Sequence, residues 1–149
     1  MCAVIETYPE ADAYGVWAPE HSPDFDDDAD TRALRQRALA IREHMPSLDD
    51  IHASGNFTPK SDKDLEFDAL QMHLASALID RVKRRHPEVR LGVSLLFRGY
   101  LLRALDTLLP KDVWIANMEN CGSGGPQMNY YDGIADRDLI VIPRIVDDG

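Results

Sequence analysis

Short runs of strand-forming residues lie at both ends of this sequence, on either side of a middle with helical periodicity. Residues 2–8 and 14–18 carry such runs near the start, and residues 113–118 and 139–142 carry them near the end. This order predicts an α+β fold. We expect a small antiparallel sheet built from the N- and C-terminal strands, with three helices packed on one of its faces.

The connections between the later strands favour the antiparallel arrangement. Parallel strands need a crossover of a dozen or more residues, usually with a helix in it. The loops between residues 113 and 142 are interpreted as too short for such a crossover, which argues against a parallel Rossmann-type sheet. Pro143 predicts that the last strand lies at a sheet edge or ends there, because proline cannot donate to a strand ladder.

Two helices are predicted from stripes of apolar residues that recur every three or four positions. The first covers residues 31–45. The second begins at Ser61, where Asp64 three residues later completes a short capping box. It ends before Pro87, because the residue that precedes a proline is disfavoured in the α region.

Residues 91–109 form the longest nearly apolar stretch and allow two interpretations. We expect a central helix over residues 93–109, and the alternative is a strand over residues 89–96 that leads into a shorter helix. A membrane span is not expected, because each charge in the stretch would cost about 2.5–3.5 kcal/mol at the bilayer centre. Those charges are Arg98, Arg103 and Asp106.

Negative charge is concentrated at the start of the chain. The protein has 149 residues and a formal net charge of −10. The first thirty residues hold nine acids and no lysine or arginine, and the rest is nearly neutral, with 16 basic and 17 acidic residues. We interpret residues 19–30 as an acidic loop or linker within a single domain that spans residues 1–149.

The charge and the cysteine content limit which partners the protein is expected to bind and in which cellular compartment it is expected to occur. Direct binding of duplex nucleic acid is not expected, because phosphate contacts need lysine and arginine. Two distant cysteines form no disulfide framework, and no secretory signal is seen, so a cytoplasmic setting is expected. Arginine outnumbers lysine twelve to four, which favours a bacterial source. No metal or cofactor is predicted. A calcium loop at the acidic segment fails because Ala29 and Arg35 replace the glycine and glutamate that it requires.

Cys121 offers an enzymatic alternative. It follows an expected strand and opens a glycine-rich loop whose backbone N–H groups could hold an anion. A thiolate there could act as a nucleophile in acyl or thiol chemistry if a histidine came within reach. A half-buried cysteine at the end of a strand is the simpler interpretation. Trp17 and Trp114 lie on expected strands, and we interpret both as core residues.

The leading hypothesis is a non-catalytic protein-binding module of the inhibitor, immunity or adaptor type. Its acidic surface would attract a basic protein partner through long-range electrostatics and would disfavour other partners. A self-associating subunit, such as a homodimer, is a further alternative. Two tyrosines are interpreted either as packed on the sheet or as aromatic anchors for the partner. The residues proposed to bind the partner are Asp24, Asp26, Asp27, Asp28, Asp30, Tyr130 and Tyr131.

Overall fold

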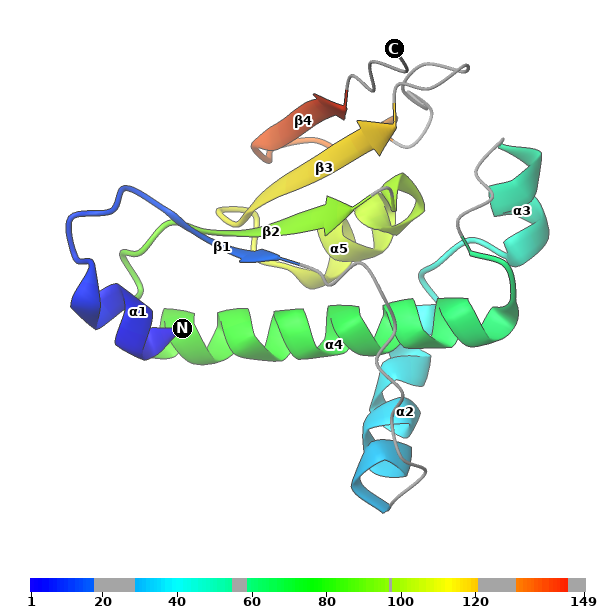
Figure 1. The fold of residues 1–149 in the computed structure, drawn as a ribbon, viewed down its shortest axis with the longest axis horizontal. Coiled ribbons are helices and arrows are strands. Elements are labelled where there is room, and N and C mark those ends of the chain that lie inside the picture. The colour runs from blue at the N-terminus through cyan, green and yellow to red at the C-terminus, as the bar shows by residue number, and fades with distance from the viewer. Residues whose placement is uncertain (18–28, 55–58, 97, 121–130, 145–149) are drawn as a thin grey trace, which may run out of the picture.

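The computed structural model places one four-stranded sheet beside a long helix (Figure 1). It describes the whole chain except residues 18–28, 55–58, 97, 121–130 and 145–149. The strands are β1 (Tyr14–Trp17), β2 (Leu91–Leu96), β3 (Trp114–Asn120) and β4 (Leu139–Arg144). Their order across the sheet is β1-β2-β3-β4.

All neighbouring strands are parallel, so the predicted antiparallel sheet is wrong. The error came from the connection between β3 and β4. It contains residues 121–138, which exceeds the dozen or so residues that a parallel crossover requires. A connection of this length therefore permits β3 and β4 to pair in parallel, even though its sequence shows no helical periodicity. Pro143 lies in β4 at one edge of the sheet, which confirms the edge prediction.

Five α-helices are present among the described residues, two more than predicted: α1 (Cys2–Thr7), α2 (Ala29–Arg42), α3 (Leu48–Ala53), α4 (Asp62–Arg85) and α5 (Leu102–Leu108). The strand predicted at residues 2–8 is wrong, because this segment forms α1. Helix α3 lies between the two helices predicted from periodicity, in a segment for which no helix is predicted. Ser47 caps it by accepting a hydrogen bond from the backbone N–H of Asp50 at 3.1 Å.

The segment after β2 follows the alternative interpretation of the long apolar stretch. Residues 91–96 form a strand, a short 3-10 turn spans Gly99–Leu101, and α5 follows directly. The continuous helix over residues 93–109 is wrong. The periodicity could not separate the two interpretations, since a strand buried in a parallel sheet is apolar on more than one side.

Helix α4 begins and ends where the sequence indicates. The backbone N–H of Asp64 donates to the Ser61 hydroxyl at 3.4 Å, and the Asp64 carboxylate accepts from the N–H of Lys60 at 2.9 Å. The helix ends at Arg85, before the His86–Pro87 pair. Helix α2 crosses α4 and projects away from the sheet (Figure 1).

One face of the sheet belongs to the hydrophobic core. In a parallel sheet, residues paired in register direct their side chains to the same face, and successive residues alternate between faces. Tyr14 pairs with Leu91, and Val93 pairs with Ile115. These four residues and Leu95 are buried in one cluster with the inner residues of α4 and α5. The residues on the opposite face of the sheet differ from these core residues, and they include Trp17 and Trp114.

Candidate functional site

Trp114 lies across two glycines on the face of the sheet opposite the core. Gly15, Gly92 and Trp114 are paired in register on three successive strands, so they share this face. A Cβ built on Gly92 would lie 1.9 Å from Cδ2 and 2.0 Å from Cε2 of the indole. The ring then continues to β1, where its Cη2 is 3.0 Å from a Cβ built on Gly15. The two glycines leave the room that the indole occupies.

Trp17 and Ile140 lie on the same face as Trp114. Trp17 pairs in register with Ser94, and Ile140 pairs with Ala116, one strand pleat further along from Gly15 and Trp114. Trp17 is 55% exposed and Ile140 is 46% exposed. The interpretation of Trp17 as a core residue is therefore wrong. We call the surface formed by Trp17, Trp114 and Ile140 the tryptophan face.

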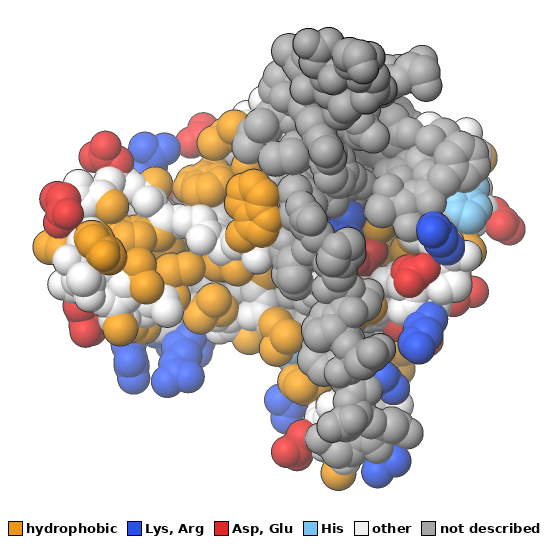
Figure 2. Space-filling model, in the orientation of Figure 1, with side chains coloured by type: hydrophobic (Ala, Val, Ile, Leu, Met, Phe, Trp, Pro, Cys, Tyr) orange, Lys and Arg blue, Asp and Glu red, His pale blue; other side chains and the backbone are white. Residues whose placement is uncertain are grey.

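The tip of the Trp114 ring and Trp17 occupy neighbouring positions. The ring reaches over Gly15, and Trp17 is two residues further along β1 on the same face, a separation of about 6.6 Å along a strand. Figure 2 shows hydrophobic side chains gathered over this part of the sheet on the side toward the viewer. The tryptophan face is thus an aromatic surface assembled from three strands.

A shallow hollow borders the tryptophan face near the start of the strands. Its lining includes Trp114, Ile140 and Arg90. The Arg90 guanidinium lies 3.5 Å from the Asp138 carboxylate, and both side chains are largely exposed. Such exposed pairs contribute little to stability, about 0–1 kcal/mol. The two charges of this pair balance each other at the border, and the second arginine of the lining, Arg137, has a fully buried side chain.

A buried polar cluster joins α4 to the segment that follows β2. Arg98 Nε donates to Asp68 Oδ1 at 2.9 Å, and the Tyr100 hydroxyl donates to Asp68 Oδ2 at 2.6 Å. All three side chains are buried. Removing one partner of a buried ion pair is costly, because a charge then remains without compensation in a low dielectric. The cluster therefore fixes where the chain turns after β2.

The pKa values in this cluster are governed mainly by burial. Burial raises the pKa of Asp68, and the opposing effects of the Arg98 charge and the Tyr100 hydrogen bond do not cancel it. Burial and the adjacent Asp68 carboxylate also raise the pKa of Tyr100, so its hydroxyl keeps the proton that it donates. Gln71 lies one turn along α4 from Asp68 and is 8% exposed. Within the described part of the chain, neither the oxygen nor the nitrogen of its amide meets a hydrogen-bonding partner.

A second buried arginine holds the connection before β4. The Arg137 side chain is fully buried, and its Nε donates to Asp106 Oδ1 at 2.9 Å. Its other donors reach four backbone carbonyls at the end of α5 and in the turn that follows. Helix C-termini leave such carbonyls without intrahelical partners, so this contact is structural. The carbonyls belong to Asp106, Leu109, Pro110 and Val113.

The pKa of Asp106 is shifted in the opposite direction from that of Asp68. Its partial burial alone would raise the pKa, but hydrogen bonds from Lys111 and Arg137, together with their charges, outweigh burial and lower it. The Lys111 ammonium is 2.6 Å from Asp106 Oδ1. Asp106 is therefore ionised and belongs to the framework that supports β3 and β4.

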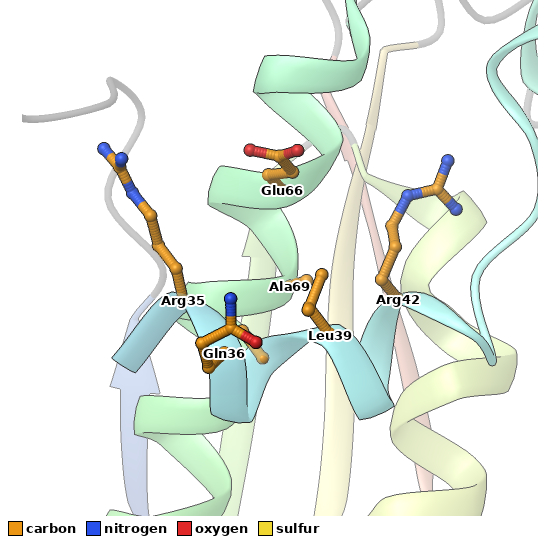
Figure 3. Close-up of a pocket in the computed structure, with 7 residues that line it drawn as sticks. Arg35, Gln36, Leu39, Arg42, Glu66 and Ala69 are labelled. Atoms are coloured by element: carbon orange, nitrogen blue, oxygen red, sulfur yellow. The ribbon is translucent and has the colours of Figure 1, made fainter. Parts of the chain in front are cut away.

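A groove between α2 and α4 forms another surface hollow (Figure 3). Arg35 and Arg42 extend on either side of Leu39, and Glu66 faces them from α4 (Figure 3). Arg42 already donates to the Pro46 carbonyl at 3.1 Å and lies 3.5 Å from Asp62. Its guanidinium is thus used in joining the helices, and the groove is part of their packing.

Most of the residues proposed to bind a partner lie outside the described residues. These are Asp24, Asp26, Asp27, Asp28 and Tyr130, and Cys121 of the enzymatic alternative lies outside as well. Asp30 is exposed in the first turn of α2. Tyr131 is half-buried against the core, and its hydroxyl accepts a hydrogen bond from Asn117 Nδ2 at 3.0 Å. This arrangement matches the packing interpretation of Tyr131.

Sequence reasoning missed the tryptophan face and the Asp68 cluster. A signal for the first existed: Gly15 and Gly92 interrupt two strands, and glycine within a strand often marks close approach by another group. The partner that approaches could not be read from the pattern, because it depends on strand register. A signal for the second was the presence of Arg98 in an otherwise apolar stretch, since a buried charge requires a buried partner.

In the described part of the chain, histidine, cysteine, aspartate and glutamate form no group of three or more that could hold a metal ion. None of its helices combines the length and hydrophobicity needed to cross a bilayer. Comparison of the sequence with protein-family models and curated proteins, and of the chain with solved structures, found no match.

Proposed function

We propose that this protein is a non-catalytic binding module that engages a basic partner protein through the tryptophan face and the acidic residues near its start. The supporting observation is the 55% exposure of Trp17 on a sheet whose strands are all parallel. Parallel sheets ordinarily have both faces covered. A large aromatic side chain left open on such a face is typical of a protein-binding surface, where tryptophan is enriched among the energetically dominant residues.

The order of the sequence supports the electrostatic part of the proposal. The acidic residues from Glu20 to Asp30 follow Trp17 directly in the chain. A chain spans at most about 3.6 Å per residue, so the seven-residue step from Trp17 to Asp24 in the sequence spans at most about 25 Å. The acids would steer a basic partner toward the tryptophan face, and salt would weaken that attraction. An inhibitor, an immunity protein and an adaptor all need this combination of a contact surface and charges that attract the partner to it.

Site-specific crosslinking tests this function. A photoreactive benzoylphenylalanine replaces Trp17 in one variant and Leu74 in another. Leu74 is a matched control, because it is 44% exposed but lies on α4. We expect position 17, but not position 74, to crosslink to a basic protein in an extract of the source cells. Replacing Asp24, Asp26, Asp27, Asp28 and Asp30 by asparagine should reduce the yield at low salt. Equal yields at both positions would contradict the proposal.

A further inference from the structure

The outer surface of the Trp114 ring is available to a ligand. The ring passes over Gly92 and reaches Gly15, so one of its π faces lies against the sheet and the other is directed away from it. Trp114 is partly buried but keeps some exposed surface. The face of an indole carries negative electrostatic potential and is the aromatic surface that attracts cations best. The tryptophan face therefore offers more than apolar area to whatever binds there.

The net charge of the protein favours some ligands of the tryptophan face over others. A second copy of this chain would bring a further net charge of −10 to the contact, and like charges across an interface are unfavourable. Among the described residues, the exposed cation that lines the border is Arg90, and its contact with Asp138 balances its charge. A cationic side chain from a partner meets both the negative potential of the ring and the negative charge of the whole molecule.

We propose that the occupant is a segment of a basic partner protein whose arginine side chains lie flat on the indoles of Trp114 and Trp17. This inference rests on the proposed function and adds the chemistry that the tryptophan face recognises. Arginine suits the surface better than lysine, because its planar guanidinium is weakly hydrated and stacks on aromatic rings. The neighbouring positions of the two rings suit a segment that presents arginines along one side.

Intrinsic fluorescence gives a local readout of this contact. The chain contains two tryptophans, and both belong to the tryptophan face. The probe is a capped peptide of alternating arginine and alanine residues. The matched control peptide has citrulline in place of arginine, which keeps the planar shape and most of the hydrogen bonds but removes the charge. We expect the arginine peptide to change the emission saturably and to bind at least tenfold more tightly than the citrulline peptide.

Trp17→Leu separates local binding from general attraction to an acidic protein. Trp17 is exposed, so its replacement leaves the fold intact, and Trp114 still reports binding. We expect at least a threefold loss of affinity for the arginine peptide. A variant with Leu74→Ala, on α4, should bind as the original protein does.

Three outcomes would overturn the inference. Equal affinity for both peptides would show that charge is not recognised. Unchanged binding by Trp17→Leu would place the peptide elsewhere. Light scattering that shows a dimer, with peptide excluded from it, would identify a second copy as the occupant. In the first two cases a crosslink from position 17 to a partner protein would leave the proposed function standing, so the two failures are distinguishable.

Discussion

The indole of Trp114 lies so close to Gly92 that a Cβ at position 92 would come within 1.9 Å of it. No ordinary contact of a Cβ is this short, so any larger residue there must displace the ring. The two residues are on neighbouring strands, 22 positions apart in the sequence. This single contact links the register of the sheet to the shape of the proposed binding surface.

Gly92→Ala is therefore expected to be destabilising. Overpacking lowers the free energy of unfolding by about 1–3 kcal/mol. Replacing glycine by alanine also restricts the unfolded chain, but this raises the free energy of unfolding by only about 0.4–1 kcal/mol. Urea unfolding should show the loss, and the tryptophan emission should shift because Trp114 moves. Gly15→Ala should cost less, since the nearest atom there, at 3.0 Å, belongs to the end of the ring. If the double variant Gly92→Ala, Trp114→Leu is no more stable than the single variant Gly92→Ala, the clash with the indole is not the cause of the lost stability.

Tyr100→Phe is expected to destabilise the protein through Asp68. The Tyr100 hydroxyl donates to Asp68 Oδ2 at 2.6 Å, and its removal leaves a buried carboxylate oxygen without that donor. Such a loss costs about 1–3 kcal/mol. Tyr8→Phe is a suitable control, because Tyr8 is 56% exposed and its substitution should change the unfolding free energy by less than about 0.5 kcal/mol. Equal effects of the two substitutions would remove Asp68 from the explanation.

The pH dependence of stability should carry opposite contributions from Asp68 and Asp106. The folded-state pKa of Asp68 is raised above 3.8, so the folded protein binds the proton more tightly than the unfolded chain does. Between 3.8 and that raised pKa, the Asp68 contribution to stability falls as pH rises. In Asp68→Asn this contribution should disappear. Thermal unfolding across the range would measure it, and a variant that keeps the original slope would contradict the assignment.

Asp106 should favour the folded state at higher pH. Its folded-state pKa is lowered below 3.8, so its contribution is fully present above 3.8 and is lost as pH falls through the lowered value. We expect Asp106→Asn to be less stable at neutral pH and to lose less stability on acidification. Denaturant midpoints at neutral pH and near pH 3 would measure both effects. A variant that loses as much stability as the original protein would show that Asp106 does not contribute to acid sensitivity.

Arg137→Ala should be among the most destabilising changes in the described part of the chain. The side chain is fully buried, and its removal takes a donor from Asp106 and from four carbonyls. Asp106 keeps its contact with Lys111, and the Pro110 carbonyl keeps the N–H of Val113. Each buried acceptor that loses its donor costs about 1–3 kcal/mol, and Arg137→Ala removes several such hydrogen bonds together. Arg137→Lys should recover only part of this loss, because an ammonium has three donors and no planar fork. Arg103→Ala, on the exposed side of α5, should change stability by less than about 0.5 kcal/mol.

Local signals predicted the parts of the fold that depend on neighbours in sequence. The capping pair of Ser61 and Asp64 marked the start of α4, and Pro87 marked its end. Strands β3 and β4 lie where β-branched runs indicated. The signals failed at α1 and within the long apolar stretch, because a short helix and a short strand bury similar side chains.

The sequence by itself determined the positions of the strong helices and strands, the acidic start and the edge location of Pro143. Tertiary structure alone decided that the sheet is parallel, that Trp114 rests on Gly92, and that Arg98 meets Asp68. The physical reason is the distance along the chain. Capping, proline restriction and periodicity act over a few residues, whereas register and buried pairing join residues 22 to 77 positions apart and exist only once the chain has packed.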